Sequence, residues 1–510
     1  MRVLLGPLWR DQRIGFAVGL GIAVLAGLLV ALVLPRGPVT ALQAVALLPV
    51  CLVTGGLIGL ITRSRWAALL APIAHAAAFE LGRLGADGPT VDGLRTGTAY
   101  GILAFALGRL VYVLVGTLPL TLGGIYGAAF ARRLRGTITL VARLGARVWR
   151  YARRGLTGLA TAGLVALAVG FVLPASTPPV PGSDGRVTPG GIAELTTVRL
   201  GGHDQAIMIH AASADKPVLL YLSGGPGQSD LPFSRVLLDD LARDFVVVGW
   251  DQRGTGKSYP ALDPATLTLD GAIADTIALT NYLRERFDEP KIYLLGESYG
   301  TLLGVLAAQR RPDLYHALIG SGQMVSVRET DRRLYQDVLD LAARTGDTAL
   351  AEEMRAYGEP PYGDFFASSV VFQQYDRLYR PYTPPAAYAA RGTASGIGPW
   401  GVFAPEYTLI EKVGVLRGLM DTFAVMYPQL QGVDFRRDVP RLAVPVYIMD
   451  GEGELTARRA LTLEWYAQLD APQKHLFTFM DAGHSVAFEE FAAFHRIMVE
   501  TVLPETYPGR

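Results

Sequence analysis

"KIYLLGESYGTLLGVLAAQRRP", residues 291–312, carries the strongest structural signal in this chain of 510 residues. An apolar run leads into Gly296-Glu297-Ser298-Tyr299-Gly300 and continues directly into an amphipathic segment. This pattern predicts a buried strand, a tight turn and a helix. Small residues on both sides of Ser298 permit so tight a turn, which lifts the serine hydroxyl clear of the sheet. The stretch therefore predicts a nucleophilic serine at the carboxyl end of a strand.

A serine hydroxyl is a poor nucleophile until a base takes its proton and an acid orients that base. In "KHLFTFMDAGHSVAFEEF" (474–491), His484 lies on a glycine-containing loop between a predicted strand and a predicted helix. The other downstream histidines, His316, His475 and His495, lie in or beside regular elements. We therefore predict that His484 is the base.

Three carboxylates are candidates for the acid. "VPVYIMDGEGELTARRA" (444–460) predicts another buried strand that ends in a turn, and Asp450, Glu452 and Glu454 all lie in that turn or next to it. Strand and turn patterns by themselves leave the choice open.

Four short motifs in order resemble the proline iminopeptidase branch of the α/β-hydrolases, peptidase family S33. They are "GGPG" (224–227), "DQRGTGKS" (251–258), "GESYG" (296–300) and "GHS" (483–485). The resemblance extends over residues 190–500 and implies an α/β-hydrolase sheet with a helical cap insertion. It also implies that Ser298 is the nucleophile and His484 the base. The family's acid follows a Gly-x-x-Asp pattern; here Glu454 takes that position, and Asp450 is the alternative.

The resemblance further implies an oxyanion hole made by the backbone N–H groups of Gly225 and Tyr299. The family's His-Gly-Gly-Pro-Gly loop reads Ser-Gly-Gly-Pro-Gly here, over residues 223–227. Such donors stabilise the tetrahedral oxyanion by roughly 3–4 kcal/mol each.

The end of "DQRGTGKS" also matches the end of a nucleotide-binding P-loop. A P-loop needs a glycine five residues before Gly256, but Asp251 occupies that position and would face the phosphates with a carboxylate. The resemblance instead implies a structural loop that lines the site.

The first 174 residues have a different composition. Hydrophobic residues make up 50% of the chain and the mean hydropathy is +0.28, both high for a purely soluble protein. We predict an all-α transmembrane domain over 1–174 with about five helices, in the apolar runs 14–34, 41–62, 66–82, 98–131 and 157–174. The run 66–82 is the weakest because it contains His75 and Glu80. The run 98–131 is interpreted as one span, with two short spans as the alternative.

Arginine placement predicts the orientation of these spans. Basic groups lie before the first span, after the second, and in the eight-arginine stretch between the fourth and fifth spans, residues 132–154. Placing all three groups in the cytoplasm satisfies the positive-inside rule. With five spans, the chain after residue 174 then lies outside, so we predict a multi-pass plasma-membrane protein with an extracytoplasmic catalytic domain.

The net charge of +1 gives no reason to expect a nucleic-acid partner. The eight-arginine stretch is interpreted as a solvated connector near anionic lipid. Cys51 is the only cysteine, which excludes an intramolecular disulfide and a cysteine-based metal site. We expect no metal and no cofactor.

Composition also suggests domain boundaries. Residues 175–191 are rich in Pro, Gly and Ser and form the predicted linker. The predicted hydrolase core covers 192–325, beginning with a hairpin over 193–200 and 205–211, and resumes at 440–510. Between them, 326–439 forms the helical cap, whose aromatics either line an apolar pocket or form the cap's own core. Because aminopeptidases of this family hold the substrate amine with cap carboxylates, Glu329 and Asp331 are candidates for that role.

The sequence thus predicts a membrane-anchored serine hydrolase, an aminopeptidase that removes an N-terminal residue such as proline through an acyl-enzyme. An esterase or lipase acting on apolar esters is the alternative with the same fold. A non-catalytic membrane binding or transport protein is the alternative from another class, and the full set of Ser, His and acid argues against it. The expected partners are a small peptide or ester substrate and the lipid bilayer.

Overall fold

The computed structural model describes residues 9–34, 36–84, 88, 90–134, 144–181, 187–362, 365–394 and 401–508. The chain divides into two compact units. The first is helical and is built mainly from residues before Ala175, together with Thr408–Ile410. The second contains Gly93–Ala104, Ala175–Tyr407 and the chain from Glu411 onward.

The regular structure that is described in the first unit is helical. The helices are α2 (Gln12–Val33), α3 (Ala41–Thr62), α4 (Ala67–Gly82), α5 (Ala99–Tyr112), a π-helical turn (Val113–Thr117), α6 (Leu118–Leu134) and α7 (Leu144–Val172). Helix α5 begins in the segment Gly93–Ala104, which belongs to the second unit. Four stretches are long and apolar enough to cross a membrane: Gln12–Val33, Ala41–Thr62, Ala99–Leu134 and Val148–Val172. The stretch Ala99–Leu134 is one uninterrupted helix, whereas α4 is apolar but only 16 residues long.

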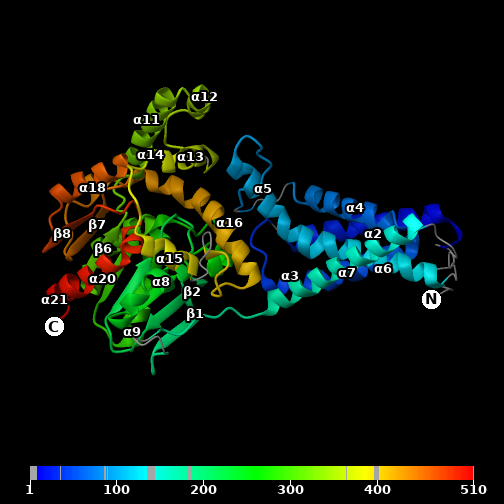
Figure 1. Cartoon of the computed structure of the whole chain (residues 1–510), viewed down its shortest axis with the longest axis horizontal. Coiled ribbons are helices and arrows are strands. Elements are labelled where there is room, and N and C mark those ends of the chain that lie inside the picture. Colours follow the sequence, from blue (N-terminus) through cyan, green and yellow to red (C-terminus); the bar gives the residue numbers. More distant parts are fainter. Residues whose placement is uncertain are drawn as a thin grey trace. The chain divides into compact units, whose positions relative to one another are not determined.

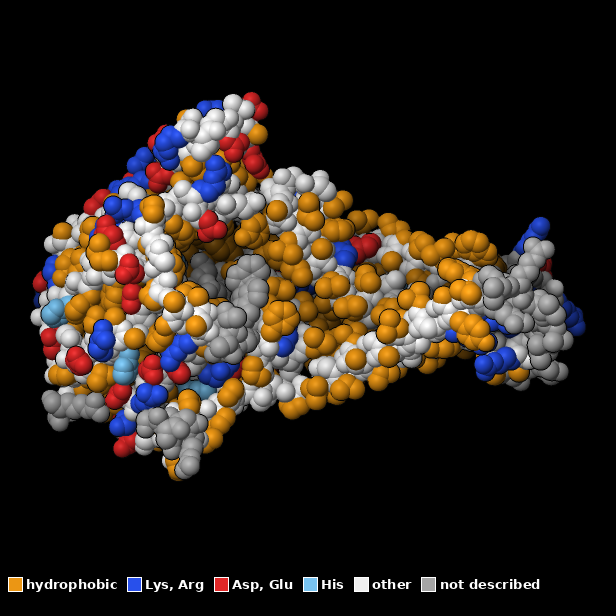
Figure 2. All heavy atoms as spheres, in the orientation of Figure 1, with side chains coloured by type: hydrophobic (Ala, Val, Ile, Leu, Met, Phe, Trp, Pro, Cys, Tyr) orange, Lys and Arg blue, Asp and Glu red, His pale blue; other side chains and the backbone are white. Residues whose placement is uncertain are grey.

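Glycines allow α3 and α6 to pack backbone against backbone. A Cβ atom on Gly59 would lie 2.2 Å from the carbonyl oxygen of Gly124, and one on Gly123 would lie 2.0 Å from that of Leu52. No side chain fits at these positions, which is the small-residue packing typical of membrane helices. Leu32 on α2 and Leu42 on α3 are examples of exposed apolar residues in the first unit. On the face drawn in Figure 2, hydrophobic side chains cover much of this helical unit. Such a surface suits lipid better than water.

The second unit is built on an eight-stranded sheet with the order β1-β2-β4-β3-β5-β6-β7-β8 (Figure 1). Its strands are β1 (Ile192–Leu200), β2 (His203–Ala211), β3 (Val218–Leu222), β4 (Val246–Trp250), β5 (Ile292–Glu297), β6 (Tyr315–Ser321), β7 (Val446–Gly451) and β8 (Lys474–Phe479). The β1–β2 and β2–β4 pairs are antiparallel and all other pairs are parallel. The predicted hairpin and α/β sheet are confirmed.

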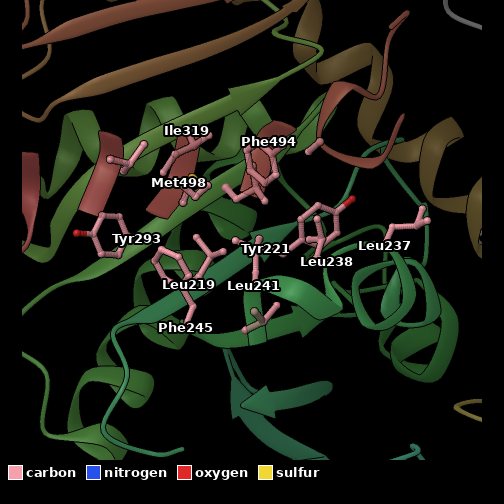
Figure 3. Packing of buried hydrophobic residues seen from close by; sticks show 14 of the residues in the cluster. Leu219, Tyr221, Leu237, Leu238, Leu241, Phe245, Tyr293, Ile319, Phe494 and Met498 are labelled. Atoms are coloured by element: carbon pink, nitrogen blue, oxygen red, sulfur yellow. The ribbon is translucent and has the colours of Figure 1, made fainter. Parts of the chain in front are cut away.

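Helices on both faces of the sheet explain why its central strands are continuous apolar runs. The core-domain helices are α8 (Leu231–Leu237), α9 (Leu269–Phe287), α10 (Tyr299–Arg310), α18 (Thr456–Gln468), α19 (Val486–Glu489), α20 (Phe491–Ile497) and α21 (Leu503–Thr506). On one face, Tyr221, Tyr293 and Ile319 of the sheet pack with Phe494 and Met498 from the C-terminal helices (Figure 3). The carboxyl ends of β5, β6 and β7 are thereby fixed at one edge of a rigid sheet.

The insertion between β6 and β7 is helical in the part that the structure describes, as predicted for a cap. It contains α11 (Val327–Thr345), α12 (Thr348–Tyr357), α13 (Phe365–Phe372), α14 (Tyr375–Leu378), α15 (Ala386–Ala394), α16 (Leu409–Met426), a 3₁₀ helix (Tyr427–Gly432) and α17 (Phe435–Asp438). Phe423 stacks on Tyr427 with ring centroids 4.2 Å apart, and Phe365 and Phe372 pack edge-on against Phe423. These four aromatics therefore pack on one another within the insertion.

Candidate active site

Ser298 lies at a strained turn between β5 and α10. Its φ is +51° and its ψ is −118°, a conformation that non-glycine residues rarely adopt and that is typically found at functional sites. The turn is fixed because Ser298 N donates to the carbonyl of Ser321 (3.0 Å). The Thr301 hydroxyl donates to the carbonyl of Ser298 (2.6 Å).

The two glycines of the motif are required by packing. A Cβ atom on Gly300 would lie 1.9 Å from the carbonyl oxygen of Leu222, and one on Gly296 would lie 2.7 Å from the carbonyl carbon of Gly300. Strand β3, the turn and the start of α10 are therefore in backbone contact. This close backbone packing explains why the motif has glycine at positions 296 and 300, as the sequence pattern predicted.

His484 lies on the loop between β8 and α19, and its Nδ1 forms a hydrogen bond with Oε2 of Glu454. Glu454 is buried, with 4% of its surface exposed, and its Oε1 accepts from the N–H of Leu455 (2.7 Å). A Cβ atom on Gly322 would lie 2.8 Å from the His484 ring. Since Gly322 follows Ser321, which binds the Ser298 N–H, the end of β6 holds the Ser298 turn and the His484 loop together.

The environment of Glu454 keeps its carboxylate ionised. Burial alone would raise the pKa of this carboxyl, but the charge and hydrogen bond of His484 lower it, as do the Arg458 guanidinium and the Leu455 N–H. The net pKa lies below the ordinary value for glutamate. An ionised carboxylate on Nδ1 fixes the imidazole tautomer and can stabilise the imidazolium that forms during catalysis.

Ser298 Oγ contacts Met324 Sδ at 3.8 Å, and no hydrogen bond joins it to His484 among the described residues. Both side chains are only half-buried. In enzymes without substrate, catalytic hydrogen bonds are often long and tighten only when the substrate binds. The arrangement is thus compatible with a nucleophile and base that engage on binding.

The two other candidate acids are occupied elsewhere. Asp450 Oδ2 accepts from Arg459 Nε (3.0 Å) and from the hydroxyl of Thr478 (3.4 Å). Glu452 pairs with Arg380 (2.8 Å) and Arg459 (2.6 Å). The geometry therefore favours Glu454 over Asp450 as the partner of His484.

The loop that begins at Ser223 lies against Ser298. A Cβ atom on Gly224 would lie 3.2 Å from Ser298 Cβ, and Gly225 has a φ of +107°, which favours glycine. Tyr299 is the first residue of α10, so its N–H has no carbonyl partner within that helix. The placement is compatible with Gly225 and Tyr299 as the oxyanion donors.

The two cap carboxylates predicted to hold a substrate amine already have protein partners. Glu329 accepts from Arg332 and Arg333, each at 2.8 Å. The hydrogen bond from Arg332, followed by that from Arg333, lowers the pKa of Glu329 to about 2. Asp331 is buried and accepts from Tyr427 and from Gln431 (2.9 Å), and burial raises its pKa to about 6.

In the loop that resembles the end of a P-loop, the side chain of Asp251 fills the inside of the turn. Asp251 is buried, and its Oδ2 accepts from the backbone N–H of Lys257 (2.8 Å). Burial raises the pKa of this carboxyl to about 8. Lys257 Nζ pairs with Glu411 (2.8 Å). A phosphate has neither the space nor the free lysine that it would need in this turn.

Within the described chain, no cluster of three or more His, Cys, Asp or Glu residues could hold a metal ion.

Sequence reasoning missed Arg458, on α18. Its Nη1 lies 3.7 Å from Glu454 Oε1 and 3.4 Å from His484 Nδ1. One sequence signal could have pointed to Arg458. It follows Glu454 by four residues, and this spacing brings opposite charges together when a helix begins just after the first of them.

The comparisons with known proteins agree with the fold. A family model described as "alpha/beta hydrolase fold" matches residues 217–491, more than half of the chain. The chain belongs to the α/β-hydrolase fold family. The resemblance inferred from the four motifs is thereby confirmed, and the sheet with its helical insertion is the architecture of an α/β-hydrolase.

Among curated relatives, the chain is 28% identical over 305 residues to a probable aminopeptidase, YbaC, of Bacillus subtilis. That match covers 59% of this chain and 94% of the relative. The chain is also 28% identical over 296 residues to a proline iminopeptidase of Thermoplasma volcanium, covering 57% of this chain and 90% of the relative. A crystal structure of a proline iminopeptidase of Mycobacterium smegmatis is 18% identical, with a TM-score of 0.42, covering 62% of this chain and 100% of that one.

Proposed function

We propose that this α/β-hydrolase is a membrane-anchored serine hydrolase that acts as an aminopeptidase. The hydrogen bond between His484 and the buried Glu454, next to the strained turn of Ser298, carries the proposal. Relatives named aminopeptidase and proline iminopeptidase support a peptide substrate with a free N-terminal residue.

The chemistry follows from these positions. Ser298 Oγ attacks the substrate carbonyl while His484 Nε2 takes the hydroxyl proton, and Glu454 stabilises the imidazolium. The N–H groups of Gly225 and Tyr299 hold the tetrahedral oxyanion. His484 then gives the proton to the leaving amine as the C–N bond breaks, which leaves an acyl-enzyme on Ser298. A water deprotonated by His484 releases the acid and regenerates the serine.

A substrate panel tests the proposed function. The full chain in detergent is assayed on prolyl- and other aminoacyl-arylamides, on the same arylamides with an acetylated amine, and on p-nitrophenyl esters. We expect kcat/KM for a free-amine arylamide to exceed that of its acetylated partner at least tenfold, because an aminopeptidase recognises the amine. Turnover of the esters alone would favour the esterase alternative. The absence of any turnover, together with no labelling by a fluorophosphonate, would favour a non-catalytic role.

We further propose that the catalytic domain is extracytoplasmic. Three arginine groups fall on one side of the helical unit if α4 crosses the membrane together with the four longer stretches. The chain then crosses the membrane five times. With the first arginine group in the cytoplasm, the chain after α7 is outside. If α4 lies in the interface instead, the catalytic domain is cytoplasmic, and the arginine groups no longer share one side.

Added protease is therefore expected to digest the C-terminal domain in intact spheroplasts, while an epitope inserted into the 132–154 connector stays protected until lysis. Immunoblotting against each segment measures both. Protection of the C-terminal domain with digestion of the connector epitope would show that α4 does not span.

A further inference from the structure

Arg458 on α18 is a buried guanidinium that lies between the catalytic pair and the cap. Only 9% of its surface is exposed. Its Nη1 lies 3.7 Å from Glu454 Oε1 and 3.4 Å from His484 Nδ1. Its Nη2 donates to the hydroxyl of Tyr375 (3.0 Å), at the start of cap helix α14, and the guanidinium carbon lies 5.0 Å from the centre of that ring.

When the imidazole is in its working tautomer, Arg458 Nη1 and His484 Nδ1 are both hydrogen-bond donors, so their contact is not a hydrogen bond. Nδ1 must carry the proton that it shares with Glu454, so it cannot accept a hydrogen bond from the arginine. The guanidinium therefore acts on the pair through its charge. It favours the ionised carboxylate and disfavours the addition of a proton to the pair.

The other titratable groups around the catalytic pair do not supply this positive charge. They are the phenols of Tyr375, Tyr379, Tyr382 and Tyr427, and the carboxyls of Asp331, Asp450 and Glu489. Burial raises the pKa of Tyr375 to about 12, so its phenol is neutral across the working range. Arg459, the next residue on α18, is engaged by Asp450 and Glu452.

We propose that Arg458 is a positioning residue that links cap helix α14 to Glu454 and holds the Glu454–His484 pair in its working form, an ionised carboxylate beside a neutral imidazole with its proton on Nδ1. This inference rests on the proposed serine-hydrolase function. It assigns two separable properties to one side chain. The charge acts on the protonation of the pair, and the planar fork spans the distance between the acid and Tyr375, which a compact ammonium group cannot do.

Substitutions separate these two properties. In Arg458→Gln, the midpoint of the acid limb of the kcat/KM profile is expected to rise by about one pH unit. The sign follows because loss of a nearby cation makes protonation of the pair easier, so activity is lost at a higher pH. At a pH below both midpoints, kcat/KM should fall about tenfold below that of the wild type. Arg458→Lys keeps the charge and is expected to leave the midpoint in place while lowering kcat on the plateau.

Arg459→Gln is the matched control because it removes the neighbouring charge on the same helix from a side chain that faces Asp450 and Glu452. Its midpoint is expected to stay at the wild-type value. Near-UV circular dichroism and the stoichiometry of fluorophosphonate labelling report whether each variant in detergent is folded.

A folded Arg458→Gln variant with an unchanged midpoint would overturn the inference. Should that variant fail to fold, Arg458→Met removes the charge without leaving a buried amide and takes its place. If neither folds, a midpoint displaced by a full unit in Arg458→Lys would overturn the proposal, and an unmoved one would support it. Full activity in Ser298→Ala would instead overturn the proposed function itself, so the two failures are distinguishable.

Discussion

Replacing Ser298 with alanine is expected to lower kcat by about 10⁶-fold, as in a serine protease that has lost its nucleophile. Among the described residues, Ser298 is the only hydroxyl-bearing one with a positive φ. It lies against the Gly224 loop and bonds to the end of β6, where Gly322 contacts the His484 ring. The fold should remain because the turn is fixed by backbone contacts to Ser321 and Thr301, which alanine retains. Steady-state turnover of an aminoacyl-arylamide measures the effect.

Covalent labelling provides an independent measurement. A fluorophosphonate should modify Ser298 in the wild type, and mass spectrometry of the peptide that contains it identifies the site. Ser234→Ala is a suitable control, since this buried serine donates to the carbonyl of Leu231 (2.9 Å) within α8 and should leave labelling unchanged. Wild-type labelling of the Ser298→Ala variant would refute the assignment of the nucleophile.

Replacing Glu454 with glutamine is expected to lower kcat by about 10⁴-fold. The amide cannot stabilise an imidazolium, and its NH₂ group would present a donor to Nδ1, favouring the wrong tautomer of His484. The pH-independent plateau of kcat, measured with the substrate used for Ser298→Ala, isolates this effect from changes in protonation.

Asp450→Asn is the matched control for the acid. Because Asp450 bonds to Arg459 and Thr478, its loss should change kcat less than tenfold while lowering thermal stability. A large loss of kcat in Asp450→Asn, combined with a small one in Glu454→Gln, would mean that the roles are reversed.

Local patterns were sufficient to predict most of the architecture. The apolar runs of β5 and β7, the glycines around Ser298 and the placement of His484 between a strand and a helix all follow from residues a few positions apart. The apolar runs of the N-terminal unit likewise predicted its helices, because length and hydropathy decide whether a segment can cross a bilayer. These features depend on periodicity and turn chemistry, which a chain expresses before it folds.

Contacts between distant residues decided which polar side chains meet. Asp450, Glu452 and Glu454 lie within five positions of one another, and strand and turn patterns do not say which of them faces His484. The structure selects Glu454 because Arg459 engages the other two while β8 brings the histidine loop alongside. The ion pairs of Glu329 follow from helix spacing, since Arg332 and Arg333 lie three and four residues further along.

Asp331 shows the opposite case, because its partners Tyr427 and Gln431 lie about a hundred positions away along the chain. Arg458 combines both kinds of contact: helix spacing places it beside Glu454, but its bond to Tyr375 exists only once the cap has packed onto α18. A buried charge must find partners wherever packing brings them, since leaving it unpaired in a low-dielectric interior is costly. Pairing of that kind is a property of the packed interior rather than of any short stretch of the sequence.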